Sequence, residues 1–466
     1  MNNYTNINFI KKILTNKDLL IADFGLEKEG LRIIKDAKLS LSKHPQIFGN
    51  KLYNPYITTD FSESQIEIIT PTFDTIDETL DFLSFIIDLV NNSISEDEYI
   101  WPQSLPCILP KDHMIPIAEY EGKKGIASME YRKQLAQRYG TKKQMISGIH
   151  YNFSFKEKTI QKLYKNTDKT INYQDFKNQI YLKISRNYLR LKWLLIYMTG
   201  NSVAAHKSFT EECINLMQYE DANNSVYSKD GISFRNSKIG YKNVDPLYPR
   251  YDTVENFVHD VNTFIDENFI SEAKELYTQI RLKPKNPENY LESLEKDGIK
   301  YVEIRTIDLN PWEKTGISKK DMEFVHLFII YLLICEESDY DNWQEESVYN
   351  EELIAQKGFT KNLKLINDGR EITFKSWANQ IINQIDNLNK TLELSKEHII
   401  ENLRNKLDNP DKTYASQLIS QVEKENFIDS QLKLAIKYKE ESIQNFNIDE
   451  IKDNPKLLKY YQEALP

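Results

Sequence analysis

The feature that most constrains the fold is a strand pattern in which polar and apolar residues alternate. In residues 23–33, DFGLEKEGLRI, Glu27 and Glu29 stand two positions apart, so their side chains share one face of a strand. The same alternation recurs in residues 57–71, 145–155 and 301–305. Such a chain is expected to fold around an antiparallel sheet that is apolar on one face and polar on the other.

Composition sets the size and broad class of the molecule. The chain has 466 residues, of which 40% are hydrophobic and 12% aromatic, so it can bury a large core. A net charge of -10 argues against a phosphate backbone as the main partner, because nucleic-acid binding depends on clustered Lys and Arg. We therefore expect one large globular domain with a smaller one, and no nucleic-acid partner.

Cysteine usage and hydropathy bear on the compartment. Cys107, Cys213 and Cys335 are widely separated, and no two have metal-ligand spacing, which favours reduced thiols. The N-terminal residues lack a charged region followed by an apolar core, and the most apolar run, residues 324–335, is too short to span a bilayer. The sequence predicts a soluble, cytoplasmic protein with no membrane partner.

Helical patterns separate the expected strands. Thr75 and Glu78 form a capping box before an apolar stripe, which predicts a helix that covers the apolar face of the sheet. A helix capped by Ser128 is expected to end at Gly140, and a longer one covers residues 174–197.

The remaining segments are less regular. Residues 201–249 show no clear period, and residues 277–281 give a further strand that carries Gln279 and Arg281 on one face. Asn286 is expected to start a helix. From residue 318 onwards the pattern is helical throughout.

The polar strand faces are informative as a set. Taken singly, a strand with two glutamates is usually a solvated surface, and a lone His150 is usually a structural histidine. These faces, however, carry few balancing lysines beside their acids, which are Glu27, Glu29, Glu67 and Glu303. Carboxylates gathered in one place must be neutralised by protonation or by cations, and oxygen ligands suit Mg²⁺ or Mn²⁺.

A site with this many acids indicates several metal ions and a nucleotide, because Mg²⁺ takes most of its ligands from water and phosphate. Arg235, Arg281 and Arg305 could then bind phosphate or a substrate carboxylate by forked hydrogen bonds. The chain contains no P-loop, no dinucleotide-binding glycine motif and no nucleophile elbow. The residues alone predict a metal-dependent, ATP-using site and leave phosphoryl transfer and ligation open.

Seven ordered motifs make the chain resemble bacterial glutamate-cysteine ligase, also called gamma-glutamylcysteine synthetase. They are FGLEKEGLRI, ITTDFSESQIEIITP, YIWPQSLPC, YRKQLAQRYG, MISGIHYNFS, FRNSKIGY and YVEIRTIDLNP, which together cover roughly residues 23–316. The chain is most similar to the ligase module of bifunctional glutathione-synthesising enzymes, and an ATP-grasp domain is not expected here.

The resemblance implies an α+β fold of the glutamine synthetase-like kind, in which a curved antiparallel sheet forms an active-site funnel surrounded by helices. It implies a catalytic ligase core in residues 1–316 and a helical C-terminal region, residues 317–466, packed on that core. It also implies that ATP phosphorylates the γ-carboxylate of L-glutamate and that the amine of L-cysteine attacks the γ-glutamyl phosphate, the first step of glutathione biosynthesis. Whether a separate glutathione synthetase acts downstream stays open.

The resemblance also assigns roles to single residues. It implies that Arg305 stabilises the transferring phosphoryl group or the glutamate, with Glu303 as its catalytic neighbour, and that Gln144 lies near glutamate. The implied metal ligands are Glu27, Glu29, Asp60, Glu67, His150 and Glu303. The implied cysteine site consists of Phe61, Tyr131, Ile146, Arg235 and Tyr241.

Two alternatives remain beside cysteine ligation. Residues 201–249 form a short polar segment, so the acceptor amine could differ and the enzyme could be another ATP-dependent γ-glutamyl ligase. A non-catalytic relative that binds nucleotide or amino acid is the second alternative. The full acidic set argues against it, because a binding module has no need for so many metal ligands.

Overall fold

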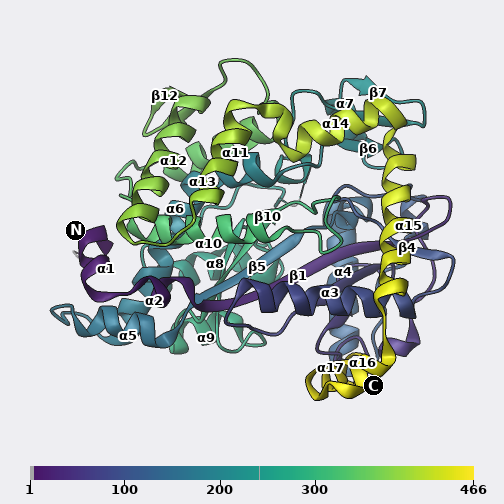
Figure 1. Ribbon diagram of the computed structural model, residues 1–466, viewed down its shortest axis with the longest axis horizontal. Helices are drawn as coiled ribbons and strands as arrows, with labels where there is room; N and C mark the ends of the chain where they lie inside the picture. The colour runs from purple at the N-terminus through teal and green to yellow at the C-terminus, as the bar shows by residue number, and fades with distance from the viewer. Residues whose placement is uncertain (1–4, 241) are drawn as a thin grey trace.

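A computed structural model describes residues 5–240 and 242–466, and its centre is one antiparallel sheet (Figure 1). The strands lie in the order β2-β3-β1-β5-β10-β9, and β4 pairs with the far end of β1. Their bounds are β1 Ala22–Ile34, β2 Ile57–Thr59, β3 Gln65–Ile69, β4 Glu98–Ile100, β5 Ile149–Phe155, β9 Ile280–Lys283 and β10 Tyr301–Ile307. Every pairing among them is antiparallel.

Helices cover the apolar face of this sheet. These are α3 (Ile76–Ser93), α6 (Tyr173–Thr199) and α10 (Lys319–Ile334), and they pack on β1 and β10 or on one another. His326 of α10 packs edge-on against Phe24 of β1, and its Nε2 donates a hydrogen bond to the Leu19 carbonyl at 3.0 Å. Phe24 and Tyr151 are almost fully buried, so this face forms the core.

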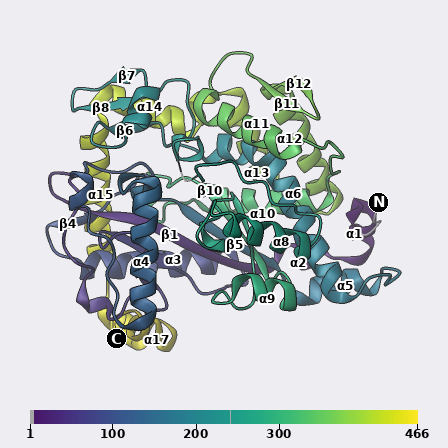
Figure 2. The same cartoon turned by 180° about the vertical axis from the view of Figure 1, so that it is seen from behind.

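Helix α4 (Gly122–Tyr139) lies on the other side of the sheet, as Figure 2 shows from behind. The remaining helices surround this framework, and two small sheets, β6-β8-β7 and β11-β12, lie outside it. The remaining helices are α1 Ile7–Ile13, α2 Asn16–Leu20, α5 Glu157–Lys165, α7 Glu211–Leu216, α8 Val254–Asp266, α9 Tyr290–Asp297, α11 Trp343–Lys357, α12 Phe374–Thr391, α13 Glu397–Asp408, α14 Tyr414–Glu425, α15 Phe427–Asn445, α16 Ile448–Asp453 and α17 Pro455–Ala464. The small strands are β6 Ala204–His206, β7 Tyr219–Glu220, β8 Ser225–Tyr227, β11 Lys364–Asn367 and β12 Arg370–Thr373.

The C-terminal helices return to the N-terminal part of the chain. Helix α15 runs along α3 and β4 (Figure 1). Asn91 of α3 donates to Ser442 Oγ at 2.9 Å, and Lys439 Nζ donates to the Glu98 carbonyl at 2.7 Å. Tyr56 in turn donates to Glu463 at 2.5 Å. The last helices therefore fasten the edge of the main sheet.

The predicted α+β class with an antiparallel sheet and a helical C-terminal region is confirmed. Thr75 caps α3 as predicted, the helix expected to end at Gly140 does so, and the helix expected over residues 174–197 is α6. No helix in the described ranges is both long and apolar enough to cross a membrane. The division at residue 316 stays a prediction.

Several boundaries were wrong. Helix α4 begins at Gly122 rather than near Ser128, and residues 57–71 form a hairpin, β2 and β3, around a turn at Asp60. Residues 201–249 contain the strands β6 to β8, which are too short to give a period. The C-terminal region also holds the hairpin β11-β12, whose turn needs the positive φ of Gly369.

A buried ion pair fixes the far end of β1. Arg32 is fully buried, and its Nη1 donates to Glu98 Oε1 of β4 at 2.6 Å. Its Nη2 donates to the carbonyls of Ser42 at 2.7 Å and of Glu63 at 2.9 Å. Arg32 therefore joins β1 to β4 and to the turn before β3, which holds the register of the strand that carries Glu27 and Glu29.

We predict that Arg32→Met lowers the free energy of unfolding at pH 7 by about 3–5 kcal/mol, because it leaves Glu98 buried without its cation. Burial would raise the pKa of Glu98, but Ser40, Ser42 and Arg32 hold it below its ordinary value of 4.5. This stabilisation is present above pH 4.5 and is lost as the pH falls below it. In urea unfolding, the difference in the free energy of unfolding between the wild type and Arg32→Met should be smaller at pH 4 than at pH 7.

The control for this test is Arg250→Met. Arg250 is half-exposed and pairs with Asp260 on the surface, so its loss should cost less than about 1 kcal/mol at either pH. Equal losses in the two variants would show that the buried pair has no special role.

Candidate active site

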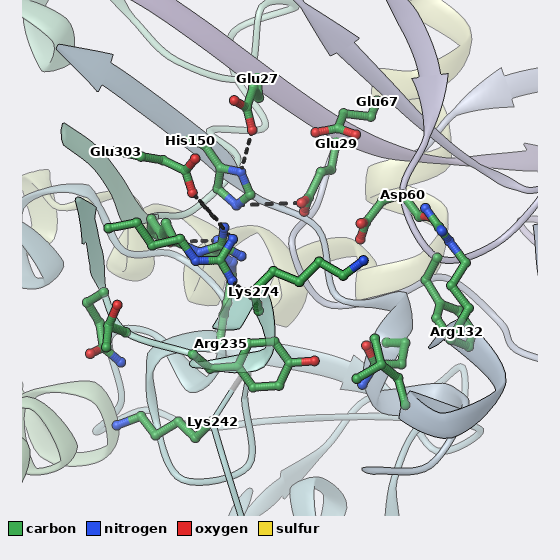
Figure 3. Close-up of a pocket in the computed structure, with 18 of the residues that line it drawn as sticks. Glu27, Glu29, Asp60, Glu67, Arg132, His150, Arg235, Lys242, Lys274 and Glu303 are labelled. Carbon is green, nitrogen blue, oxygen red and sulfur yellow. Dashed lines mark hydrogen bonds and ion pairs between the residues drawn. The ribbon is translucent and has the colours of Figure 1, made fainter. Parts of the chain in front are cut away.

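The polar face of the main sheet borders a cavity of about 270 Å³ beneath α4 and residues 274–283 (Figure 3). Its walls come from β1, β3, β5 and β10, from α4 and from the loops between them. The predicted site residues that line it are Glu27, Glu29, Asp60, Phe61, Glu67, Tyr131, Gln144, His150, Arg235, Glu303 and Arg305. Residues scattered over almost 280 positions of sequence therefore face one cavity.

Strand register gathers an imidazole and three carboxylates in this cavity. Glu27 of β1 lies opposite His150 of β5, and Glu29 lies opposite Glu67 of β3. His150 Nδ1 is 3.0 Å from Glu27 Oε2, and its Nε2 is 3.5 Å from Glu29 Oε1 (Figure 3). One ligand atom from each of Glu27, Glu67 and His150 lies within 4.8 Å of the other two. This spacing fits a metal centre.

The crowding of carboxylates changes their protonation. Burial, together with the charges of Glu27 and Asp60, raises the pKa of Glu67 well above its ordinary value. Burial and Asp60 also raise the pKa of Glu29 to about 8. Among the described residues, Glu67 has neither a hydrogen bond nor an ion pair at its carboxylate. A cation among these groups would relieve the repulsion.

Glu303 of β10 is the carboxylate that the protein neutralises with its own cations. Its Oε1 accepts a hydrogen bond from Arg305 Nη1 at 2.6 Å, and its Oε2 pairs with Lys283. Arg281 Nη1 lies 3.8 Å from Oε1. Burial would raise the pKa of Glu303, but Lys283 and Arg305 hold it well below its ordinary value. Glu303 therefore stays ionised and holds Arg305 in the cavity.

Arg235 is positioned by close packing and by a buried acid. Its guanidinium lies against Gly148, where a Cβ would come within 2.1 Å of Nη2, so a larger residue at position 148 would displace the guanidinium. Nη2 donates to the Arg305 carbonyl at 2.8 Å, and Nη1 lies 3.9 Å from Asp308 Oδ1. The other oxygen of Asp308 accepts the Ser202 hydroxyl at 2.8 Å. The position of Arg235 thus depends on groups behind the cavity.

The covering segments bring positive charge. The ammonium group of Lys274 lies 3.9 Å from the ring centroid of Tyr131 and extends toward the acidic side of the cavity (Figure 3). Arg132 of α4 donates from Nε to the Asp60 carbonyl at 2.6 Å. Most acids of the cavity therefore gather on β1 and β3, whereas its cations come from β9 and β10 and from the segments that cover the sheet. This arrangement suits metal ions together with anionic substrates.

One predicted residue is not brought to the cavity wall, and another cannot be compared with it. The side chain of Ile146 is buried and does not line the cavity, although its carbonyl accepts a hydrogen bond from Gln65 Nε2 at 3.0 Å. Ile146 directly follows a 3-10 turn, Lys142–Met145. Gln144, within that turn, lines the cavity, whereas Ile146 does not. Tyr241 lies outside the described residues.

Sequence reasoning missed several lining cations. Lys283 stands two residues after Arg281 on β9, and this spacing could have placed it on the same polar face. Lys274, Lys242 and Arg132 lie on loops or on α4, where alternation gives no signal.

The donor set fits the predicted cofactors. Carboxylate oxygens with one imidazole are ligands that Mg²⁺ and Mn²⁺ accept, and the raised pKa of Glu67 reflects excess negative charge that a divalent ion would offset. The arginines and lysines on the other side can bind phosphate or carboxylate oxygens.

Clustered carboxylates on one face of an antiparallel sheet, with lysines and arginines around the same cavity, define an enzyme site for metal ions and anionic small molecules. The chain belongs to the glutamate-cysteine ligase family, whose model matches residues 7–354. This confirms the predicted resemblance.

Named relatives agree with the family. The chain is 38% identical over 423 residues to the glutathione biosynthesis bifunctional protein GshAB of Clostridium perfringens, covering 90% of this chain and 54% of that protein. It is 40% identical over 433 residues to the corresponding protein of Listeria monocytogenes, covering 91% of this chain and 55% of that one. The chain thus spans about half the length of these relatives.

Solved structures share the fold. The glutamate-cysteine ligase of Francisella tularensis, solved in complex with AMP, matches with a TM-score of 0.87 and 26% identity, covering 96% of this chain and 92% of that chain. A bifunctional glutathione synthetase of Pasteurella multocida matches with a TM-score of 0.82 and 28% identity, covering 96% of this chain and 57% of that one.

We predict that Glu29→Gln stabilises the protein in EDTA, increasingly so as the pH rises. Because the folded-state pKa of Glu29 is raised to about 8, its ionisation costs stability between pH 4.5 and 8 in the wild type. The variant avoids this cost, so thermal unfolding at pH 8 should favour it by about 1–3 kcal/mol, with little difference at pH 5. Glu401→Gln, at an exposed position, is the matched control. If the wild type were the more stable protein at pH 8, the repulsion between Glu29 and the neighbouring carboxylates would be contradicted.

Proposed function

We propose that this protein joins the γ-carboxylate of L-glutamate to the amine of L-cysteine, using ATP and forming a γ-glutamyl phosphate on the way. The observation that carries the proposal is that clustered carboxylates and several lysines and arginines line the same cavity. The chain that forms this cavity is a member of the glutamate-cysteine ligase family. A carboxylate is a poor electrophile until it bears a good leaving group, which explains the use of ATP. The family assignment supports a carbon-nitrogen ligase that binds ATP.

We propose that Mg²⁺ or Mn²⁺ is held by Glu27, Glu29, Asp60, Glu67, His150 and Glu303. When bound, such ions would offset the negative charge of the triphosphate while the phosphoryl group transfers. Support comes from the 4.8 Å grouping of three of these residues and from the raised pKa of Glu67.

The chain's own groups have distinct parts in this proposal. Arg305, oriented by Glu303 at 2.6 Å, donates hydrogen bonds to the transferring phosphoryl group or to glutamate. Lys283 and Arg281 lie on the same side and can bind further phosphate oxygens. Gln144 lies in the wall near the acids and is proposed to contact glutamate.

Cysteine is proposed to bind in the part of the cavity beside Arg235. Arg235 would hold its carboxylate, with Phe61 and Tyr131 as walls. Ile146 and Tyr241 remain predicted members of this pocket. Since the Ile146 side chain lies off the cavity wall, a different acceptor amine is the runner-up function, and the product assay below separates the two.

The wider setting is also a proposal. Every residue that lines the cavity lies between Glu27 and Arg305, within the proposed catalytic core of residues 1–316, and residues 317–466 support it through α10 and α15. We place the reaction in the cytoplasm. A glutathione synthetase, within the same protein or separate from it, would consume the product.

We predict that the purified protein releases phosphate from ATP only when Mg²⁺, glutamate and an acceptor amine are all present. Mass spectrometry of the products, with a mixture of amino acids supplied, should show γ-glutamylcysteine as the main species. Glu303→Gln should lower turnover by several orders of magnitude, because it removes a charge shared by the metal site and Arg305. Phosphate release that does not require glutamate would contradict a ligase.

We predict that Arg235→Ala raises the Michaelis constant for cysteine by about 30-fold or more while those for glutamate and ATP change little. Losing a charge-assisted contact made by one substrate typically costs about 2–5 kcal/mol. Initial-rate kinetics with each substrate varied in turn will measure this.

Two controls interpret that result. Asp308→Asn removes the charge behind Arg235 without touching substrate, so it should move the cysteine constant in the same direction but less. Arg250→Ala, at a surface ion pair, should leave all constants unchanged. If Arg235→Ala instead raises the glutamate constant alone, the two amino-acid sites are exchanged.

A further inference from the structure

A second cavity of about 250 Å³ adjoins the candidate active site. It lies between α6, α11, the segment 242–251 and residues 276–279. Lys242 and residues 277–279 line both cavities. Figure 3 shows Lys242 on the side away from the acidic cluster. None of the carboxylates proposed to hold metal ions lines this second cavity.

One end of the second cavity is charged. Glu351 of α11 is fully buried there, with Lys192 Nζ 2.9 Å from its Oε2 and Lys242 Nζ 3.2 Å from its Oε1. Neither carboxylate oxygen has a hydrogen bond of acceptable geometry within the described ranges, and the same holds for Lys242 Nζ. The Glu351 carboxylate can therefore accept further hydrogen bonds, and the Lys242 ammonium group can donate further ones.

The charges at this end favour a ligand that carries both signs. Lys192, Lys238 and Lys242 line this end together with Glu351 and Asp245, and Glu352 lies 4.0 Å from Lys242, so positive and negative groups are nearly balanced. The lysines can pair with a carboxylate of the ligand, and Glu351 can accept a further hydrogen bond from an ammonium group. A ligand that carries only one sign of charge would meet like charges here.

Much of the remaining wall is apolar. The apolar lining residues are Leu189, Val244, Pro246, Leu247, Tyr248, Pro249, Leu276 and Val348, and Asn243, Thr278, Gln279, Gln344 and Ser347 line the cavity beside them. Val244 is 69% exposed. Asn243 fixes the segment by donating to the Glu275 carbonyl at 2.8 Å and accepting from Tyr277 N at 2.9 Å.

We propose that this second cavity binds an α-amino acid with an apolar side chain. Its ammonium group donates to Glu351, its carboxylate pairs with Lys242 and Lys238, and its side chain packs against Leu189, Leu276 and Val348. The site is separate from the proposed ligase chemistry and does not depend on it. Because Lys242 belongs to both cavities, occupancy of the second also changes substrate affinity in the first.

The test is calorimetric titration of the whole chain with L-leucine and L-phenylalanine, in EDTA and without ATP. We expect saturable binding of at least one of them at a single site. Leucine analogues that lack one charge, 4-methylpentanoate and 3-methylbutylamine, should each bind at least tenfold more weakly. No saturable binding of either amino acid overturns the proposal, and equal binding of 4-methylpentanoate overturns it in favour of a plain anion site.

Variants locate the binding. Val348→Trp fills the cavity from a partly exposed position and should abolish binding, while Glu351→Gln should weaken it at least tenfold. Because Glu351 lies between two lysines, Glu351→Gln could destabilise the fold. Its binding is therefore interpreted only if its thermal unfolding matches that of the wild type. If it does not match, Val348→Trp alone decides whether the ligand binds in this cavity. Arg235→Ala, in the other cavity, should bind as the wild type does. Binding that survives Val348→Trp but is lost in Arg235→Ala overturns the proposal, because the ligand then occupies the active site.

Discussion

The gathering of like charges on one face of an antiparallel sheet is the constraint on which the rest of this structure depends. The pairing register sets Glu27 against His150 and Glu29 against Glu67, so the carboxylates cannot separate without breaking strand hydrogen bonds. Their mutual repulsion is visible in the raised pKa values of Glu29 and Glu67. A fold that keeps this arrangement gives up stability to hold a site ready for cations.

That cost explains how firmly the acidic strands are fastened elsewhere. The opposite face of β1 is buried under helices, and Arg32 fastens its far end to β4 through Glu98. The basic groups are fastened in the same way: Glu303 holds Arg305, and Gly148 with Asp308 holds Arg235. Arg305 and Arg235 are therefore each oriented by a neighbouring acid, which is what pre-organisation requires.

The sequence could predict the parts of the site that lie on regular strands, because alternation is local and fixes the face of every residue. Glu27, Glu29, Glu67, His150, Glu303 and Arg305 were found in this way or by motif, and all line the cavity. Lys274 and Lys242 were missed because loops carry no period. Ile146 was carried over from a motif, but motifs fix order along the chain and not the direction of a side chain beside a 3-10 turn. The early start of α4 was missed because Glu121 makes no side-chain cap.

The division of charge between layers bears on specificity. Glu27, Glu29, Glu67 and Glu303 are on paired strands, whereas Lys242, Lys274 and Arg132 lie on the segments that cover the sheet. In the proposed reaction, the groups for metal and phosphate therefore belong mainly to the sheet. Changing residues 242–249 or 274–279 could alter which amine is accepted without disturbing the acidic cluster. Residues 242–249 and 276–279 also line the second cavity, so the two cavities share the same covering segments.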